Sequence, residues 1–334
     1  MTSLSDALRA GPVVLDGGLA TSLEARGHDV GGALWSARLL RDDPSAIAEV
    51  HAAFAAAGAQ VATTASYQAT VTGFLAAGVE AGEARRLIAG SVELARRGAP
   101  EGWVAGSVGP YGAYLADGSE YTGAYTDPRW AGRAGGGLTV AELRAFHRPR
   151  MELLAGAGAD VLACETVPAV AEAEALLAEA ASLDVPVWLS LTTVVDGLGT
   201  VRTRRGEPAA EVFAMAAEVP AVIAVGVNCA APADVLPAVR TAAPFGKPVV
   251  AYPNSGERWD AVGRRWAGPA AFDATAVRSW VAAGARLVGG CCRVGPSEIA
   301  GLVRCWNGPA AGAGREPASG GGQRGPSTGW GGHR

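Results

Sequence analysis

Eight apolar, β-branched runs recur along the chain and alternate with alanine-rich helical patterns. They occupy residues 13–18, 60–67, 103–110, 160–166, 186–193, 221–229, 248–255 and 286–292. Each run ends abruptly in small or polar residues, which is typical of buried strands that stop at a loop. The stretches between them, such as SAIAEVHAAFAAAG and AVAEAEALLAEAASL, carry apolar residues at three- and four-residue spacing and break at glycine or proline. The pattern predicts eight strand–helix units.

Near-continuous apolar strands that alternate with helices indicate a parallel sheet covered by helices, and eight strands is the number that closes a barrel. The alternative is an open, doubly wound sheet. That alternative is disfavoured because the first run continues as VLDGGLATSLE, which has a Gly-Gly pair but no G-x-G-x-x-G fingerprint. We therefore predict a single (β/α)₈ barrel of the α/β class over residues 1–307. Residues 308–334 are rich in Gly, Pro and Ser without periodicity, and we expect a disordered tail.

The charge pattern excludes several classes of partner. Only 18% of the 334 residues are charged, and the net charge of −4 is spread without long runs of either sign. There is no basic stripe for nucleic acid and no polybasic segment for a membrane surface. The N-terminus does not resemble a signal peptide, and no apolar stretch approaches the roughly 20 residues of a membrane span. We expect a cytoplasmic protein that acts on small molecules; the oligomeric state is not predicted.

In a parallel barrel, functional side chains gather where strands end, because all the carboxyl ends lie on one face. The predicted strand ends supply Asp16, Tyr67, Glu165, Asn228, Cys229, Cys291 and Cys292. None of the four histidines, His28, His51, His147 and His333, ends a predicted strand.

The five cysteines are sparse and odd in number, so we expect reduced thiols rather than a disulfide framework. Cys229 is far in sequence from the Cys291-Cys292 pair, which rules out a local zinc hook. These cysteines end the sixth and eighth strands, and alternate strands of a barrel place their side chains at matching heights. We therefore expect the three sulfurs to converge.

Two neighbouring residues of a regular strand point to opposite faces, so Cys291 and Cys292 could not both reach one point from ideal β geometry. Gly289 and Gly290 precede them and allow the backbone to bend and approach closely. Three sulfur ligands with an open fourth position are typical of catalytic Zn²⁺. The alternatives are a strained vicinal disulfide or burial as small apolar residues, and we expect burial for Cys164 and Cys305.

Several segments together resemble the homocysteine S-methyltransferases, most closely the bacterial branch that uses S-methylmethionine. These are VLDGGLATSLEARG, TTASYQAT, GSVGPYGAYLADGSEY, VLACET, GVNCA, VVAYPNSGE and ARLVGGCCR. The resemblance spans residues 10–305 and implies a zinc-containing (β/α)₈ barrel. It implies an enzyme that methylates the thiol of L-homocysteine to give methionine, with S-methylmethionine preferred over S-adenosylmethionine as donor.

The resemblance also implies roles for individual residues. The implied zinc ligands are Cys229, Cys291 and Cys292. Glu165 is expected to hold the amino group of homocysteine, while Asp16 and Tyr67 shape the substrate pocket. For Glu165 and Asp16 the alternative is a structural carboxylate that caps backbone amides. Asn228 is a substrate-side candidate that orients the loop by hydrogen bonding rather than taking part in chemistry.

The expected reaction requires that the thiol become a nucleophile and that the cationic methyl donor be aligned with it. Zinc coordination deprotonates a thiol, and a methylsulfonium donor leaves as a neutral thioether, so no general acid is needed. Four tyrosines of one loop, Tyr111, Tyr114, Tyr121 and Tyr125, are expected to cover the donor, because aromatic faces attract onium cations. The alternative is a loop that packs against itself.

One segment departs from the family pattern. Residues 194–209, VVDGLGTVRTRRGEPA, stand where relatives carry a short Asp-Gly-Thr-Pro-like segment, so the donor contacts of this loop are not predicted. Two other functions remain open from the sequence. One is a methyltransferase for selenocysteine or a related thiol or selenol, and the other is a zinc- and homocysteine-binding module without chemistry.

Overall fold

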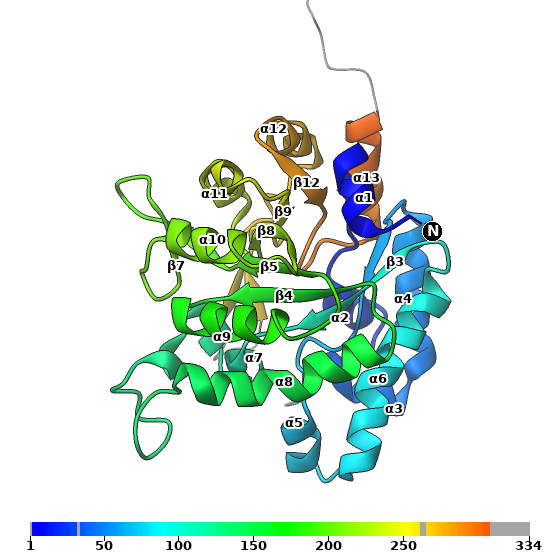
Figure 1. Ribbon diagram of the computed structural model, residues 1–334. Helices are drawn as coiled ribbons and strands as arrows, with labels where there is room; N and C mark the ends of the chain where they lie inside the picture. The colour runs from blue at the N-terminus through cyan, green and yellow to red at the C-terminus, as the bar shows by residue number, and fades with distance from the viewer. Residues whose placement is uncertain (1, 32–33, 261–264, 308–334) are drawn as a thin grey trace, which may run out of the picture.

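The computed structural model describes residues 2–31, 34–260 and 265–307 (Figure 1). Eight parallel strands form one sheet in the order β1-β12-β9-β8-β5-β4-β3-β2. They are β1 (Val13–Val14), β2 (Val61–Thr63), β3 (Trp103–Val108), β4 (Val161–Val167), β5 (Val187–Leu191), β8 (Val222–Asn228), β9 (Val249–Tyr252) and β12 (Ala285–Val288). The predicted tail, residues 308–334, lies outside the described residues.

The two outer strands of this order meet and close the sheet. Leu15 forms a parallel bridge with Val61, and the amide of Gln60 donates a 2.8 Å hydrogen bond to the carbonyl of Val14. The predicted (β/α)₈ barrel is therefore confirmed, with one strand for each of the eight apolar runs.

Helices form a layer around the barrel (Figure 1). The helices that follow its strands are α4 (Pro44–Ala56), α6 (Ala81–Gly98), α8 (Val140–Gly156), α9 (Val170–Ala180), α10 (Ala209–Ala217), α11 (Pro232–Ala242), α12 (Val277–Ala282) and α13 (Pro296–Asn307). Shorter helices lie in the loops: α2 (Leu19–Glu24), α3 (Leu39–Asp42), α5 (Val71–Ala76) and α7 (Tyr111–Leu115). Helix α8 begins with a capping box formed by Thr139 and Glu142. Gly58 and Gly158 follow α4 and α8 with φ of 99° and 87°, left-handed values that end a helix before the next strand.

Side chains of the strands alternate between the barrel interior and the helical layer. On β4, Val161 and Ala163 pack inside the barrel, whereas Leu162 and Cys164 pack against the helices. Helix α1 (Leu4–Ala10) adds Leu4 and Leu8 to the interior cluster. The interior is thus a packed core, and the site must lie beyond it, at the carboxyl ends of the strands.

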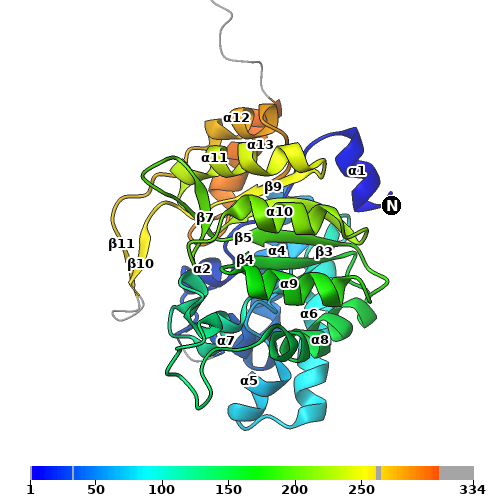
Figure 2. The ribbon, with the colours of Figure 1, turned by 60° about the vertical axis from the view of Figure 1, so that its left-hand side comes forward.

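Two hairpins and the short helices α2 and α7 surround those carboxyl ends (Figure 2). The hairpins are β6 (Thr193–Val195) with β7 (Val201–Thr203), and β10 (Arg258–Asp260) with β11 (Arg265–Ala267). The β6–β7 hairpin is formed by the segment that departs from the family pattern. Within the described ranges, no helix is long and apolar enough to cross a membrane.

Candidate metal and substrate site

Three sulfurs lie together at the carboxyl ends of β8 and β12. The Sγ atom of Cys229 is 2.8 Å from that of Cys291 and 3.5 Å from that of Cys292, and the two neighbouring cysteines have sulfurs 4.0 Å apart. All three are free thiols. In the part of the chain that the structure describes, this is the one cluster of three or more side chains with metal-ligand geometry.

The backbone at the end of β9 holds the cysteines on both sides of it. The amide of Cys229 donates to the carbonyl of Tyr252 at 3.2 Å, and the amide of Cys291 donates to that of Pro253 at 2.7 Å. Cys229 has a φ of 46°, a left-handed value outside the β region, so it departs from the alternation of strand β8. This local turn lets the residue that follows β8 share one point with the cysteines that follow β12, on the other side of β9.

Gly289 and Gly290 act through close approach rather than through a left-handed backbone, because neither is among the glycines with positive φ. A Cβ on Gly289 would lie 2.6 Å from the Cβ of Leu15, and one on Gly290 would lie 2.1 Å from Cγ1 of Val294. Strand β12 ends at Val288, so strand alternation no longer constrains the cysteines that follow. Both sulfurs can therefore reach the same point.

The donor set fits a thiophilic ion. Tetrahedral zinc with sulfur at about 2.3 Å places two sulfurs roughly 3.8 Å apart. The 3.5 and 4.0 Å separations bracket that value, whereas the 2.8 Å separation of Cys229 and Cys291 is shorter, so these two sulfurs must move apart by about 1 Å to hold the ion. Hydrogen bonds from Cys291, from Cys292 and from Tyr121 hold the pKa of the Cys229 thiol well below its usual range. The hydrogen bonds to Cys229 raise the pKa of the Cys291 and Cys292 thiols, so without a metal the cluster favours one thiolate, at Cys229, and a bound metal would have to deprotonate the other two.

A ring of polar side chains lies just below the sulfurs. Glu165 continues the inward positions of β4, and its Oε1 accepts a hydrogen bond from the hydroxyl of Ser107 on β3. Its Oε2 accepts a 3.0 Å hydrogen bond from the hydroxyl of Tyr252 on β9. Burial raises the pKa of Glu165 to about 7, and these two hydrogen bonds partly oppose that rise. The pocket wall thus contains a carboxyl group whose two Oε atoms are each fixed by a hydrogen bond, one from Ser107 and one from Tyr252.

Asp16 both lines the pocket and caps the backbone. Its carboxylate accepts hydrogen bonds from the amide (2.7 Å) and the hydroxyl (2.8 Å) of Thr63, and burial raises its pKa to about 7. Asn228 accepts from the amide of Thr166 at 2.6 Å and from the hydroxyl of Ser190 at 2.8 Å. Its side chain thus holds the end of strand β4, and Asn228 is not part of the pocket wall.

The tyrosines separate into two groups. Tyr67, Tyr121 and Tyr252 line the pocket, and the hydroxyl of Tyr121 lies 3.5 Å from Sγ of Cys229. Tyr111 instead packs against other aromatic rings. The centre of its ring lies 4.8 Å from the ring centre of Phe146 on α8, and 5.4 Å from the ring centres of Tyr114 and Tyr125.

Tyr111 is not among the residues that line this pocket, so the substrate contact expected for it stays a prediction. The loop after β3 lines the pocket through Tyr121, while the other three tyrosines pack against one another, as in the alternative interpretation.

Sequence reasoning missed three polar residues of this region. Ser107 occupies an inward position of β3, a signal that strand alternation contains. Glu120 is only 3% exposed, and its Oε2 has no hydrogen-bond partner. Arg204 reaches over the ring of Tyr121 from the β6–β7 hairpin, with its guanidinium carbon 5.7 Å from the ring centre. The last two sit on loops, where no periodic pattern indicates direction.

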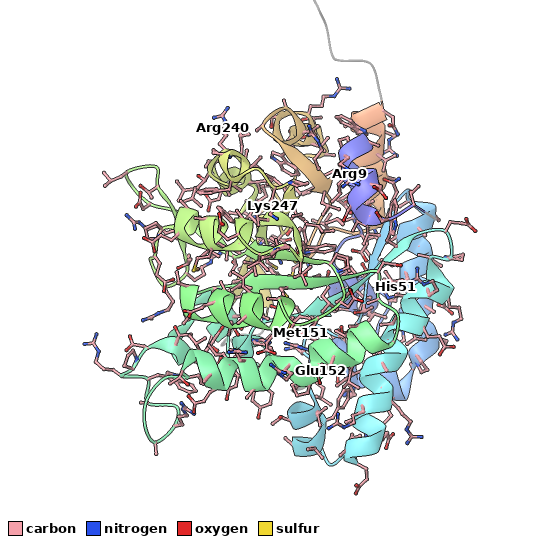
Figure 3. The ribbon with its side chains drawn as sticks, in the orientation of Figure 1. Arg9, His51, Met151, Glu152, Arg240 and Lys247 are labelled. Atoms are coloured by element: carbon pink, nitrogen blue, oxygen red, sulfur yellow. The ribbon has the colours of Figure 1, made fainter. Side chains whose placement is uncertain are left out.

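The remaining cysteines and histidines lie away from the pocket wall. Cys164 packs against the helical layer and Cys305 lies on α13. His28, His51 and His147 are absent from the pocket lining among the described residues; Figure 3 labels His51 on α4, within the outer layer. His333 lies outside the described residues.

Comparisons with known proteins identify the family of the chain. A family model described as homocysteine S-methyltransferase matches residues 13–306. The homocysteine S-methyltransferase of Escherichia coli (strain K12) is 44% identical over 306 residues, which cover 87% of this chain and 94% of that protein. Homocysteine S-methyltransferase YbgG of Bacillus subtilis (strain 168) is 41% identical, with coverage of 86% and 92%. The metallated crystal form of MmuM from Escherichia coli superposes with a TM-score of 0.74 at 42% identity, over 89% of this chain and 98% of that one.

Proposed function

The chain belongs to the homocysteine S-methyltransferase family, and we propose that its methyl donor is a methylsulfonium compound, S-methylmethionine in preference to S-adenosylmethionine. Its acceptor is the thiol of L-homocysteine, and the product is methionine. The observation that carries this proposal is the presence of three converging sulfurs and a buried carboxyl group, Glu165, in the wall of one pocket.

We assign the three cysteines as ligands of Zn²⁺. They are soft donors, and three protein ligands leave a position for a substrate atom, as in catalytic zinc sites. The metallated form of the Escherichia coli relative supports a metal in this family. Zinc bound there would lower the pKa of the homocysteine thiol and keep its sulfur as a thiolate.

Glu165 binds the ammonium group of homocysteine in this account. Ser107 and Tyr252 fix both carboxyl oxygens, so the group is oriented before substrate arrives. A bound ammonium favours the ionised carboxyl and lowers its pKa from about 7. Asp16 adds a second buried carboxyl group to the pocket wall, held by Thr63.

The transfer forms one carbon–sulfur bond and breaks another. The homocysteine sulfur supplies the electron pair that binds the methyl carbon, and the pair of the broken bond stays on the donor sulfur. The donor thus leaves as a neutral thioether and requires no proton. Protein residues need only align the two sulfurs and stabilise the donor's positive charge. The ring of Tyr121, which lines the pocket beside Cys229, is suited to that cation.

An assay with homocysteine and a panel of donors tests the proposal, with zinc measured on the same sample. We expect about one zinc per chain, the highest kcat/KM with S-methylmethionine, weaker turnover with S-adenosylmethionine, and little with betaine. A preference for betaine would overturn the donor assignment. Faster methylation of selenocysteine than of homocysteine would replace the acceptor, and zinc without turnover would leave a binding module.

A further inference from the structure

The β6–β7 hairpin and the turn that follows β7 carry three arginines, two of which have carboxylate partners. Arg202 pairs with Asp196 at 2.5 Å, and Arg205 pairs with Asp127 at 2.9 Å. Arg204 lies between them in sequence and forms no ion pair with any described carboxylate within 4.0 Å. Arg204 is therefore the one of these three cations that no described carboxylate contacts directly, although the charge of Asp234 acts on it from farther away.

The side chain of Arg204 is held against the wall of the pocket. Its Nε donates a 3.1 Å hydrogen bond to Oγ1 of Thr192, and this hydroxyl in turn donates to the carbonyl of Cys229 at 3.2 Å. Its guanidinium carbon lies 5.7 Å from the centre of the Tyr121 ring. Tyr121 and Cys229 both line the pocket, so these contacts fix the guanidinium beside it.

The two terminal nitrogens of this guanidinium have no hydrogen-bond acceptor among the described residues, and they are not enclosed, so a ligand can reach them from solvent. Burial lowers the pKa of Arg204, and Tyr121, Cys229 and Asp234 oppose that shift. An arginine remains protonated in such surroundings, and its planar fork matches a carboxylate by two parallel hydrogen bonds. A bound carboxylate would therefore satisfy both terminal nitrogens.

The position of Arg204 selects which carboxylate. In the proposed function the ammonium of homocysteine is at Glu165, and the carboxylate of the same molecule is attached to the same carbon. Arg204 is not among the residues that form the pocket wall with Glu165; its guanidinium lies over the ring of Tyr121, which is part of that wall. A carboxylate at Arg204 thus belongs to the second amino acid, which approaches over Tyr121.

We propose that Arg204 is a specificity-determining residue that binds the α-carboxylate of an amino-acid methylsulfonium donor. This inference rests on the proposed function. S-methylmethionine and S-adenosylmethionine both carry that carboxylate, so Arg204 favours both over a sulfonium that lacks it. The segment that departs from the family pattern thereby gains a role in donor recognition.

A double comparison of donor and protein tests the inference. The donors are S-methylmethionine and (3-aminopropyl)dimethylsulfonium, which has the same sulfonium and amine without the carboxylate. The proteins are the zinc-loaded wild type, Arg204→Gln and the control Arg205→Gln, which changes the neighbouring arginine on the same hairpin. For each pair, kcat/KM is measured at saturating homocysteine, together with zinc content and the Kd of homocysteine.

We expect Arg204→Gln to lower kcat/KM for S-methylmethionine by roughly 10- to 100-fold, the range of a charge-assisted hydrogen bond. The same variant should change kcat/KM for the donor without carboxylate by less than about threefold, because that donor makes no carboxylate contact with Arg204 that the substitution could remove. Arg205→Gln should affect the two donors equally. Zinc content and homocysteine affinity should match the wild type in both variants.

Equal losses with both donors would overturn the inference. A loss of zinc or of homocysteine affinity in Arg204→Gln would also overturn it, because Arg204 would then act as a counter-charge to the sulfurs. These results leave methyl transfer by the wild type intact. Failure of the wild type to use any sulfonium donor would instead overturn the proposed function and this inference with it.

Discussion

Tyr252 joins the carboxyl group of Glu165 to the cysteine cluster: its hydroxyl donates a 3.0 Å hydrogen bond to Oε2 of Glu165, and its carbonyl accepts one from the amide of Cys229. The same hydroxyl accepts a 3.0 Å hydrogen bond from Nε1 of Trp188 in the barrel interior. Tyr252, the last residue of β9, thus contacts both the carboxyl group expected to bind the ammonium and a cysteine of the expected metal site, and it fixes the spacing between them.

Tyr252→Phe removes that hydroxyl without changing the backbone contact. Glu165 then loses one of its two side-chain partners and Trp188 loses its acceptor, which should lower the free energy of unfolding by about 1–3 kcal/mol. We expect the Kd of homocysteine to rise roughly 5- to 10-fold with zinc content unchanged. Calorimetric binding and thermal melts check both effects, and an unaltered Kd would separate Glu165 from the amino group.

Glu165→Gln should remove a pH dependence. In the substrate-free protein burial raises the pKa of Glu165 to about 7. Only the ionised carboxyl attracts an ammonium, so the wild type should show an increase in homocysteine affinity through pH 7 on top of the steady rise that deprotonation of the metal-bound thiol gives both proteins. The variant should bind roughly 10- to 100-fold more weakly above pH 7 and lack this increase, with zinc retained.

Titrations of homocysteine between about pH 5.5 and 8.5 measure that dependence. Asp16→Asn is the matched control, because the pKa of Asp16 is also raised to about 7 and its hydrogen bonds go to Thr63. If Glu165→Gln and the wild type show parallel pH profiles, Glu165 is not the residue that binds the ammonium.

Each of the three serine variants, Cys229→Ser, Cys291→Ser and Cys292→Ser, should lose both zinc and methyl transfer, because an alcohol does not replace a thiolate ligand. Cys164→Ser and Cys305→Ser are the controls and should keep both, since they lie outside the cluster. Metal analysis and activity on the same samples decide this. Full activity in any one of the first three would exclude that cysteine as a ligand.

Asn228→Ala should destabilise the fold and not only the site. Asn228 makes two hydrogen bonds to Thr166, one with the amide and one with the hydroxyl. Thr166 has a φ of 60°, a left-handed conformation that costs a β-branched residue about 1–3 kcal/mol unless its surroundings hold it. We expect a decrease of about 2–4 kcal/mol in the free energy of unfolding, measured by urea denaturation. A decrease below about 0.5 kcal/mol would mean that other contacts hold the turn.

The sequence contains most of the fold because strand and helix periodicity is local. The eight apolar runs correspond to the eight strands, and the Gly-Ala pairs before β2 and β4 mark helix ends with left-handed glycines. The convergence of Cys229 with Cys291 also follows from the barrel, since both end even-numbered strands of the repeat.

Loop geometry was not predictable in the same way. The GSVGPYGAYLADGSEY segment indicates a tyrosine-rich loop, but which ring faces the pocket depends on packing against Phe146 on α8, a contact between residues distant in sequence. Arg204 likewise reaches Tyr121 through the β6–β7 hairpin. The strand alternation that puts Glu165 on the inward side of β4 also puts Ser107 on the inward side of β3.

In the proposed function, three cysteine sulfurs hold a zinc ion to which the thiol of homocysteine adds. X-ray absorption at the zinc edge of the zinc-loaded protein tests it most directly, by counting sulfur neighbours without and with homocysteine. We expect three sulfurs at about 2.3 Å in the protein alone and four after homocysteine is added. A sulfur count that stays at three on saturation with homocysteine, or that is four before its addition, would contradict the claim.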